Sequence, residues 1–406
     1  AVSLAPNFVT LKTATLACMK SFMRYFAMQK ISLLLAMTLL AASCGSSSSG
    51  NQIAFDRSSF DSRIAFLAGS YRSPEIFVMN PDGTDRCSGG PTAGAFSWSP
   101  DGSRIAFNRP DTDGSSYGEI FVMYADCTGI DSTGQKGYDL DWSPDGTKIV
   151  FADTRNHNLN FFPQVNPISV VTAGGSGVWS LRGSGCDPKW SPDGRWIAFV
   201  DQDVGEILVI NSSSRNDRYI YKPIQGDFDC GFSFGDEKFS WSPDGSQIAW
   251  KDNNFTIFLR DMPFDSDGPF NLNRATGTGK YYPLTESWED AMTGIPKWSP
   301  DGSQIAAWIC CDGIVVMDTD GTSAYELINL SWEEGLRPSA IASACEMCWE
   351  ILEDFSWSPD GSQIAFSSVG LTNNWDWLEI FVMNTDGTGL YSTGREGWNP
   401  KWSPNG

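Results

Sequence analysis

Hydrophobic and polar positions follow a pattern that returns many times along the chain. The stretch WSPDGSRIAF begins at Trp98, and close copies begin at Trp142, Trp190 and Trp241. In each copy a short strand ends at the tryptophan, the turn PDG follows, and a strand such as QIAF comes next. A variable segment then leads to a strand such as EIFVMN, a DG turn and a polar final strand. The pattern therefore predicts four short antiparallel strands in each repeat.

The spacing of the motif tryptophan is typical of the blades of a β-propeller. The tryptophans are Trp98, Trp142, Trp190, Trp241, Trp298, Trp357 and Trp402, at intervals of 44 to 59 residues. One such sheet cannot bury its own apolar faces, so neighbouring copies must cover one another. We therefore predict an all-β fold, a seven-bladed β-propeller of four-stranded antiparallel blades.

The two ends of the repeat region complement each other. SRIAF at Ser62 comes first without an inner strand, and PKWSPNG around Trp402 comes last without the strand that should follow it. We expect the C-terminal strand to pair with the strand around Ile64 in the first blade. This pairing would close the ring and leave no blade with an unpaired inner edge.

The turn residues explain why each hairpin forms. Proline presets the backbone for the second position of a type I turn, and aspartate can accept a hydrogen bond from an amide further along. Glycine takes the left-handed conformation that lets the strands continue as a hairpin. The second turn uses the same chemistry, in NPDGT at Asn80 and NTDGT at Asn384.

The repeat WSPDGSQIAF…EIFVMNTDGT resembles the repeat of the TolB-like β-propellers. The similarity covers about residues 60–406, and TolB-type chains likewise begin at a second strand and finish on a WSP strand. The resemblance implies a β-propeller of the bacterial envelope. TolB itself has fewer blades and a separate N-terminal domain that this sequence does not show, so its envelope role does not transfer directly.

Residues 1–43 differ in composition from the repeats. They contain basic residues, no acidic residue, and an apolar run from Ile31 to Ala42. The run is short for a membrane span, and the pattern is typical of an export signal. Met28 is the expected translation start, with Met19 and Met23 as alternatives.

A lipid anchor is predicted directly after this signal. The stretch LLAASCGSSSSG resembles a bacterial lipoprotein signal, in which Cys44 becomes the lipidated first residue. Residues 44–59 would then form a Ser/Gly tether and an N-terminal strand before the propeller of residues 60–406. The alternative is ordinary signal cleavage beside Ser43, which would leave Cys44 as a spare thiol.

The excess of acidic residues limits the classes of partner that the protein can bind. The chain has 28 Lys plus Arg against 49 Asp plus Glu, a formal net charge of −21. This acidity argues against nucleic acid, because binding to the phosphate backbone depends on basic residues. Anionic lipid surfaces are disfavoured by the same repulsion, so we expect membrane contact only through the lipid anchor. The expected location is the periplasmic side of the outer membrane or the cell surface.

Cysteine usage suggests structural disulfides in an exported protein. The candidates are Cys87, Cys127, Cys186, Cys230, Cys310, Cys311, Cys345 and Cys348. Spacing does not fix their connectivity. However, Cys87 with Cys127, Cys186 with Cys230, and the 310/311 pair with the 345/348 pair lie in neighbouring repeats. The CxxC at Cys345 lacks a second CxxC or nearby histidine, so it does not complete a zinc site.

Long variable segments are the expected place for recognition, because the tight turns of every blade fall on the opposite face. They contain tryptophans beside acidic residues, which suit a protein or glycan surface. A tryptophan near a blade end can equally fill the space between blades. The candidate binding face consists of Trp288, Glu289, Trp332, Glu333, Trp349, Trp375 and Trp377.

Catalysis, metal ions and cofactors find little support in the sequence. His157 is the only histidine, and no G-x-S-x-G motif accompanies it. The pairs Asp111/Asp113 and Asp265/Asp267 resemble the start of a calcium loop but lack its later glutamate. We therefore predict a non-enzymatic protein without cofactor or metal.

The predicted function is that of an exported scaffold for protein binding or assembly, acting through the variable loops. One alternative is a structural subunit that forms homo-oligomers or filaments by exchange of terminal strands. In that case Gln52, Ile53, Ala54 and Phe55 would pair with the edge near Trp402 in another copy. A second alternative is a glycan-binding protein or a glycoside hydrolase with paired carboxylates.

Overall fold

A computed structural model shows that the described part of the chain is built from β-strands. It describes residues 62–70, 73–110, 118–155, 166–203, 205–213, 230, 237–251, 257–262, 280–282, 295–309, 313–320, 323–329, 355–368 and 378–404. All of them belong to the compact unit Phe60–Gly406. Every regular element in these ranges is a strand, which confirms the all-β prediction. Among these residues there is no helix with the length and apolar character of a membrane span.

Four of the sheets contain four antiparallel strands each. In sheet order they are β25 (Trp398–Trp402), β1 (Ile64–Ser70), β2 (Ser73–Met79) and β3 (Cys87–Pro91); β13 (Phe239–Trp241), β14 (Gln247–Lys251), β15 (Ile257–Asp261) and β16 (Lys280–Tyr282); β17 (Lys297–Trp298), β18 (Gln304–Ile309), β19 (Gly313–Asp318) and β20 (Ala324–Asn329); and β21 (Phe355–Trp357), β22 (Gln363–Ser368), β23 (Glu379–Asn384) and β24 (Tyr391–Glu396). Strand order follows chain order except for β25, which joins the first sheet from the other end of the chain.

The remaining strands form one continuous nine-stranded sheet. They are β4 (Phe96–Trp98), β5 (Arg104–Arg109), β6 (Glu119–Tyr124), β7 (Asp131–Trp142), β8 (Lys148–Asp153), β9 (Pro167–Thr172), β10 (Val178–Trp190), β11 (Trp196–Asp201) and β12 (Glu206–Asn211). The first part of β7 pairs with β6 and the later part pairs with β8. β10 pairs in the same way with β9 and then with β11.

The long strands β7 and β10 differ from the four separate short strands that the repeat pattern predicts. Each continues from the last strand of one repeat into the first strand of the next. The reason is the short connection: in β7, only residues 137–138 separate Lys136, which pairs with β6, from the bulge that begins at Asp139. No loop fits in this space, so the backbone stays extended.

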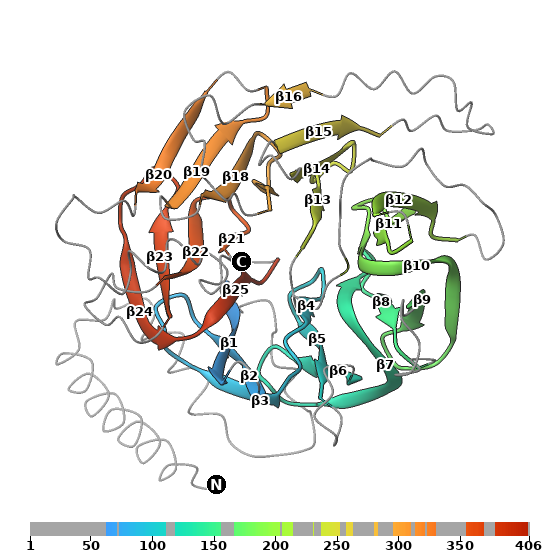
Figure 1. The fold of residues 1–406 in the computed structure, drawn as a ribbon. Coiled ribbons are helices and arrows are strands. Elements are labelled where there is room, and N and C mark those ends of the chain that lie inside the picture. Colours follow the sequence, from blue (N-terminus) through green and yellow to red (C-terminus); the bar gives the residue numbers. More distant parts are fainter. Residues whose placement is uncertain are drawn as a thin grey trace, which may run out of the picture. The chain divides into compact units, whose positions relative to one another are not determined.

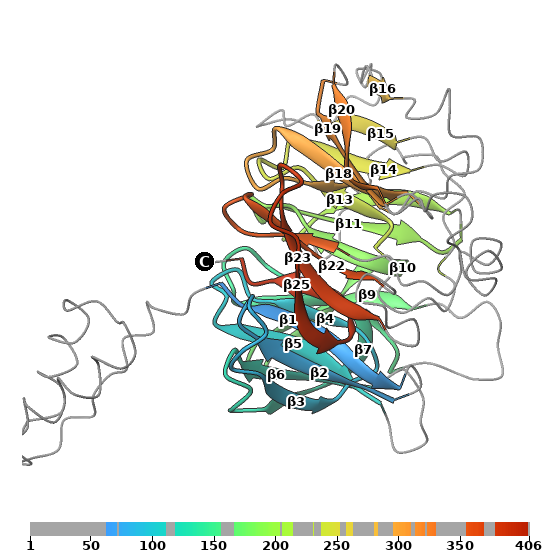
Figure 2. The same cartoon turned by 90° about the vertical axis from the view of Figure 1, so that its left-hand side faces the viewer.

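The sheets follow one another around a common centre in chain order (Figure 1). The short strands β4, β13, β21 and β25 lie nearest that centre. The view turned by 90° shows β25 beside β1, although the two strands come from opposite ends of the described chain (Figure 2). Their register pairs Ile64 with Trp402 and Ala65 with Lys401. The fold is therefore a propeller-like arrangement of small antiparallel sheets.

The apolar core is divided into clusters that lie between successive sheets or between successive repeats of the nine-stranded sheet. One cluster joins Leu67 and Ile76 of the first sheet to Phe107 on β5. Another covers the opposite face of the same sheet, where Phe66 contacts residues of the last sheet that include Ile380. Each motif tryptophan belongs to such a cluster or packs against one. In these places the tryptophans help neighbouring repeats bury one another.

Each WSPDG turn is held by its serine as well as by its proline, aspartate and glycine. Ser99 Oγ accepts a hydrogen bond from the Arg104 backbone N–H at 2.9 Å and donates to Asp101 Oδ1 at 2.6 Å. Gly102 has φ +63°, the left-handed conformation that the turn requires. The same serine contacts recur at Ser143, Ser191, Ser242, Ser299 and Ser358.

Candidate functional site

Polar residues occupy two equivalent positions on several strands near the centre. One and three residues before the motif tryptophan stand Asp141 and Asp139 on β7, and Lys189 and Asp187 on β10. The corresponding residues of β25 are Lys401 and Asn399. We call these residues, together with Glu237 and Lys297, the axial cluster. Glu237 lies shortly before β13, and Lys297 precedes the motif tryptophan of β17.

The local backbone at this position is unusual for residues other than glycine. Asp139, Asp187 and Asn399 have φ values of 51°, 49° and 52°. The pairing register of each strand shifts at the same place, as in a β-bulge. Aspartate and asparagine tolerate the left-handed conformation better than most residues because their short polar side chains can bond locally. Such conformations often mark sites that position a functional side chain.

Glu237 is the common partner of three lysines. Its carboxylate lies 3.0 Å from Lys189 Nζ, 3.4 Å from Lys401 Nζ and 3.6 Å from Lys297 Nζ. Lys189 Nζ also lies 3.6 Å from Asp187 Oδ1. Burial by itself would raise the pKa of Glu237, but the lysines outweigh burial and hold this pKa well below its usual value. Glu237 is therefore ionised and links β10, β17 and β25.

The three aspartates of the axial cluster show the opposite shift. Burial raises the pKa of Asp139 and of Asp141 to about 6, against the opposing effect of hydrogen bonds and lysines. Burial also raises the pKa of Asp187 to about 7. Titratable groups shifted in this way are more frequent at functional sites than elsewhere. Near neutral pH a small change in surroundings can therefore change their protonation.

Hydrogen bonds between neighbouring strands surround the axial cluster. They run from Trp98 Nε1 to Lys401 O (3.0 Å), from Trp142 Nε1 to Ser97 O (3.1 Å), from Trp190 N to Asp141 Oδ2 (2.7 Å), from Lys238 N to Asp187 Oδ2 (2.6 Å), from Ser240 Oγ to Pro296 O (2.6 Å), from Lys297 Nζ to Phe355 O (2.9 Å) and from Trp402 N to Ser356 Oγ (3.0 Å). The bonded residues lie on β25, β4, β7, β10, β13, β17 and β21, except Lys238 and Pro296, which directly precede β13 and β17.

A cavity of about 60 Å³ lies beside β4. Ala95 and Ser97 occupy the two equivalent positions of this repeat, and their small side chains leave space where the neighbouring strands carry longer ones. Asp139 and Asp141 line one side of the cavity, and the residues Asn399 and Lys401 also line it. The volume is far below the ~300–1,000 Å³ of pockets for drug-sized ligands, so only a small molecule or group fits.

Metal binding finds no support in this cluster. Among the residues that the structure describes, no three His, Cys, Asp or Glu side chains are placed to hold a metal ion together. The aspartates instead accept backbone N–H groups of the next strand, as Asp139 Oδ2 does from Asp187 at 2.9 Å.

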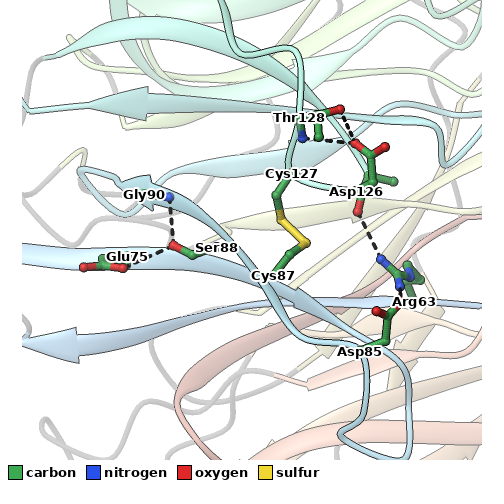
Figure 3. The surroundings of a disulfide bond; sticks show 10 residues. Arg63, Glu75, Asp85, Cys87, Ser88, Gly90, Asp126, Cys127 and Thr128 are labelled. Carbon is green, nitrogen blue, oxygen red and sulfur yellow. Dashed lines mark hydrogen bonds and ion pairs between the residues drawn. A yellow bond between two sulfur atoms is a disulfide. The ribbon is translucent and has the colours of Figure 1, made fainter.

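Within the described part of the chain, two disulfides join neighbouring repeats. Cys87 on β3 is bonded to Cys127 in the turn after β6, and Cys186 on β10 is bonded to Cys230. Figure 3 shows the first bond beside Arg63, which forms an ion pair with Asp85 and donates to the carbonyl of Ala125 at 3.3 Å. These bonds indicate that the chain folds in an oxidising, exported environment.

Most of the site residues predicted from the sequence lie outside the described residues. These are the lipidation candidate Cys44, the strand-exchange residues Gln52, Ile53, Ala54 and Phe55, the candidate binding face of Trp288, Glu289, Trp332, Glu333, Trp349, Trp375 and Trp377, and the cysteines Cys310, Cys311, Cys345 and Cys348. Trp402 is described, and it pairs with Ile64 of its own chain.

Sequence reasoning did not identify the axial cluster. The sequence holds one indication of it, at the position directly before each motif tryptophan. Four repeats carry a charged residue there: Asp141, Lys189, Lys297 and Lys401. Repeat alignment makes these positions equivalent, but it does not show that they face one another. Glu237 gives no such signal, because it lies outside the motif.

Comparisons with known proteins agree with the fold but leave the family open. No protein-family model matches the chain. Dipeptidyl-peptidase 5 of Porphyromonas gingivalis is 29% identical over 178 residues, which is 41% of this chain and 22% of that protein. The chain thus spans about a fifth of the length of this relative.

Solved structures show similarity at low sequence identity. A functionally unknown protein from Desulfotomaculum acetoxidans is 12% identical, with a TM-score of 0.50, over 84% of this chain and 97% of that one. The periplasmic gluconolactonase of Pseudomonas aeruginosa is 14% identical, with a TM-score of 0.49, over 85% of this chain and 99% of that one. The first similarity shows a shared fold and nothing about activity.

Proposed function

We propose that this chain is an exported, non-enzymatic binding module: a TolB-like, seven-bladed β-propeller that presents variable loops to a protein partner. In this proposal β25 completes the first blade and closes the ring. The observation that carries the proposal is the series of hydrogen bonds around the axial cluster, together with the pairing of β25 with β1. A frame held at every junction can present long loops without deforming.

The placement of the loops follows from antiparallel strand order. In each repeat the WSPDG turn and the DG turn connect strands at one end of a sheet. The remaining connections leave from the opposite end, and the long variable segments belong to this set. Candidate contact residues are therefore expected on one face of the frame, where tryptophans provide contact area and carboxylates provide hydrogen-bond acceptors.

An anchor at Cys44 would attach this module to the membrane through the Ser/Gly segment that follows it. The two disulfides support the exported location, and the lipid anchor is part of the proposal. Incorporation of labelled palmitate into the wild-type chain, but not into a Cys44→Ser variant, is the expected result.

Self-assembly through terminal strands is the less favoured alternative. The segment Gln52–Phe55 resembles the strand that would follow WSPNG, so it would compete for the outer edge of β25. In the structure β1 already occupies that edge, with Ile64 opposite Trp402. An added strand would therefore have to displace an existing pairing.

The test is capture of envelope proteins on the purified, lipid-free chain, followed by chemical cross-linking. A variant with Trp332→Ser and Trp375→Ser changes two candidate loop residues. A control with Val178→Ser and Leu390→Ser changes two apolar residues that are 36% and 44% exposed on the described strands and turns. We expect the same protein to cross-link to the wild type and to the control, and about tenfold less to the loop variant.

Three outcomes would contradict the proposal. Partner capture that is unchanged in the loop variant would place the contact elsewhere. Filaments in negative-stain electron micrographs of the wild-type chain would favour the structural alternative. Release of reducing sugar from envelope glycans by the wild-type chain would favour a glycoside hydrolase.

A further inference from the structure

We propose that the cavity beside β4 binds a small zwitterion, a molecule of amino-acid size that carries one ammonium and one carboxylate group. This site is lined by residues of β4, β7, β10 and β25 and residues next to these strands, not by the variable loops of the proposed function. The cavity has three features that suit such a ligand. They are a buried acceptor without a partner, charges of both signs in its lining, and its small volume.

The unsatisfied acceptor is the side-chain carbonyl of Asn399. The residue is 7% exposed, and its Oδ1 atom has no hydrogen-bond partner among the described residues. A buried polar atom without a partner destabilises the fold, so a ligand that donates a hydrogen bond to it is favoured. Asn399 lines the cavity, where an N–H donor on a ligand would satisfy its carbonyl oxygen.

Two aspartates in the lining of the cavity supply further acceptors. Asp139 and Asp141 line it from β7, and each uses Oδ2 to accept a backbone N–H from β10. Together with Asn399 they place three oxygen-bearing side chains around a small space. A primary ammonium group carries three N–H donors, which suits this set of acceptors.

Cationic groups line the same cavity. Lys401 and Lys189 both belong to its lining, as does Glu237. Lys401 Nζ lies 3.4 Å from Glu237 Oε1 and 5.3 Å from the centre of the Phe96 ring. A ligand carboxylate beside Lys401 would gain a charge-assisted hydrogen bond. An ammonium ligand alone would place a further cation beside Lys189 and Lys401, and a carboxylate alone would lie next to the aspartates. A zwitterion avoids both repulsions.

The volume and the neighbouring residues limit the ligand. A space of about 60 Å³, in which one water molecule needs about 10–15 Å³, suits a molecule with about as few non-hydrogen atoms as glycine. The space exists because the repeat at β4 carries Ala95 and Ser97, so a longer side chain at Ser97 should fill it.

The test is isothermal titration of the full chain with glycine at neutral pH, with methylamine, acetate and glycerol as comparison ligands. Methylamine carries only the cation, acetate only the anion, and glycerol neither. We expect glycine to bind at least about tenfold more tightly than any of the three, because each lost charge-assisted bond changes the affinity by about that factor.

Three variants locate the site. Asn399→Gly removes the amide while keeping a residue that accepts φ +52° without strain. Lys401→Met removes the ammonium, and Ser97→Leu fills the space. Each should weaken glycine binding by about tenfold or more. The matched control is Lys297→Met, which removes another lysine from Glu237 at the equivalent repeat position but does not line the cavity.

Thermal unfolding of every variant accompanies the titrations. If Lys401→Met does not fold, Asn399→Gly and Ser97→Leu still test the site. The proposal is wrong if glycine shows no binding at millimolar concentration, or if methylamine or acetate binds as tightly as glycine. It is also wrong if Lys297→Met loses as much affinity as the cavity variants, because the cluster would then act only on stability.

Discussion

The same residue type has opposite roles in the turns and at the axial cluster. Hydrogen bonds from Ser242 and from the backbone of Ser246 lower the pKa of Asp244, and the turns at Asp301 and Asp360 show the same effect. In the axial cluster burial raises the pKa of Asp187 to about 7. The turn carboxylates therefore stabilise the fold when they are ionised. The axial carboxylates favour the folded state more when they are protonated.

The first prediction follows from the opposite directions of these two pKa shifts. An aspartate whose pKa is raised binds its proton more tightly in the folded chain, so stability falls as pH rises from about 4 towards 8. An aspartate whose pKa is lowered adds stability above about pH 4, which is lost on acidification. We expect the free energy of unfolding, measured in urea, to be largest between about pH 4 and pH 5.

Asp187→Asn should remove part of the decline above pH 5, by about 1–3 kcal/mol between pH 5 and pH 8. The amide keeps an acceptor for the Lys238 N–H and tolerates the left-handed backbone at this position. Asp244→Asn is the control, because it should change only the acidic side of the profile. A profile for Asp187→Asn that equals that of the wild type would contradict the assigned pKa shift.

At the scale of elements, the motif tryptophans connect neighbouring strands as well as filling the space between sheets. Trp98, Trp142 and Trp357 donate their indole N–H to a backbone carbonyl on an adjacent strand. Trp190 is equally buried, but its indole nitrogen has no partner among the described residues. A comparison of Trp98 with Trp190 therefore separates the contribution of the indole hydrogen bond to stability from the contribution of the buried ring.

The second prediction compares two conservative substitutions. Trp98→Phe loses ring volume and the bond to the Lys401 carbonyl, while Trp190→Phe loses ring volume only. Trp98→Phe should therefore lower the free energy of unfolding by about 1 kcal/mol more than Trp190→Phe. Urea unfolding followed by far-ultraviolet circular dichroism measures both. Equal losses would show that the bond between β4 and β25 adds nothing to stability.

The strand pattern was predictable for most repeats and less so for β7 and β10. Residue alternation and PDG turns indicate strands and hairpins because both depend on local backbone preference. The continuation of β7 from one repeat into the next depends instead on how closely two sheets approach. The bulges at Asp139, Asp187 and Asn399 also depend on how the sheets pack. The alternation of residues along the sequence therefore did not predict them.

At the scale of the whole molecule, the proposed closure depends on the pairing of β25 with β1. If residues 398–406 are moved to directly precede Ser62, the sequence at the new junction reads WSPNGSRIAF and restores a complete repeat. We expect the free energy of unfolding of this permutant to lie within about 1 kcal/mol of the wild-type value, because the permutant keeps the pairing of β25 with β1. Deletion of residues 398–406 leaves β1 without its inner neighbour.

The deletion variant should lose several kcal/mol of stability or associate into dimers through the free edge of β1. Urea unfolding and sedimentation velocity measure the two effects. Wild-type stability in the deletion variant, or an unfolded permutant, would show that β25 does not complete the first blade.

The sequence by itself determined the all-β class, the repeat, the turn chemistry and the cysteines that are candidates for bridges. These properties depend on neighbouring residues along the chain, and the pairs Cys87 with Cys127 and Cys186 with Cys230 connect adjacent repeats. Only the tertiary structure brought Glu237 into contact with Lys189, Lys297 and Lys401, and left a cavity between Asn399 and Asp139. Those side chains come from strands far apart in sequence, and their proximity is decided by the packing of sheets around a shared centre.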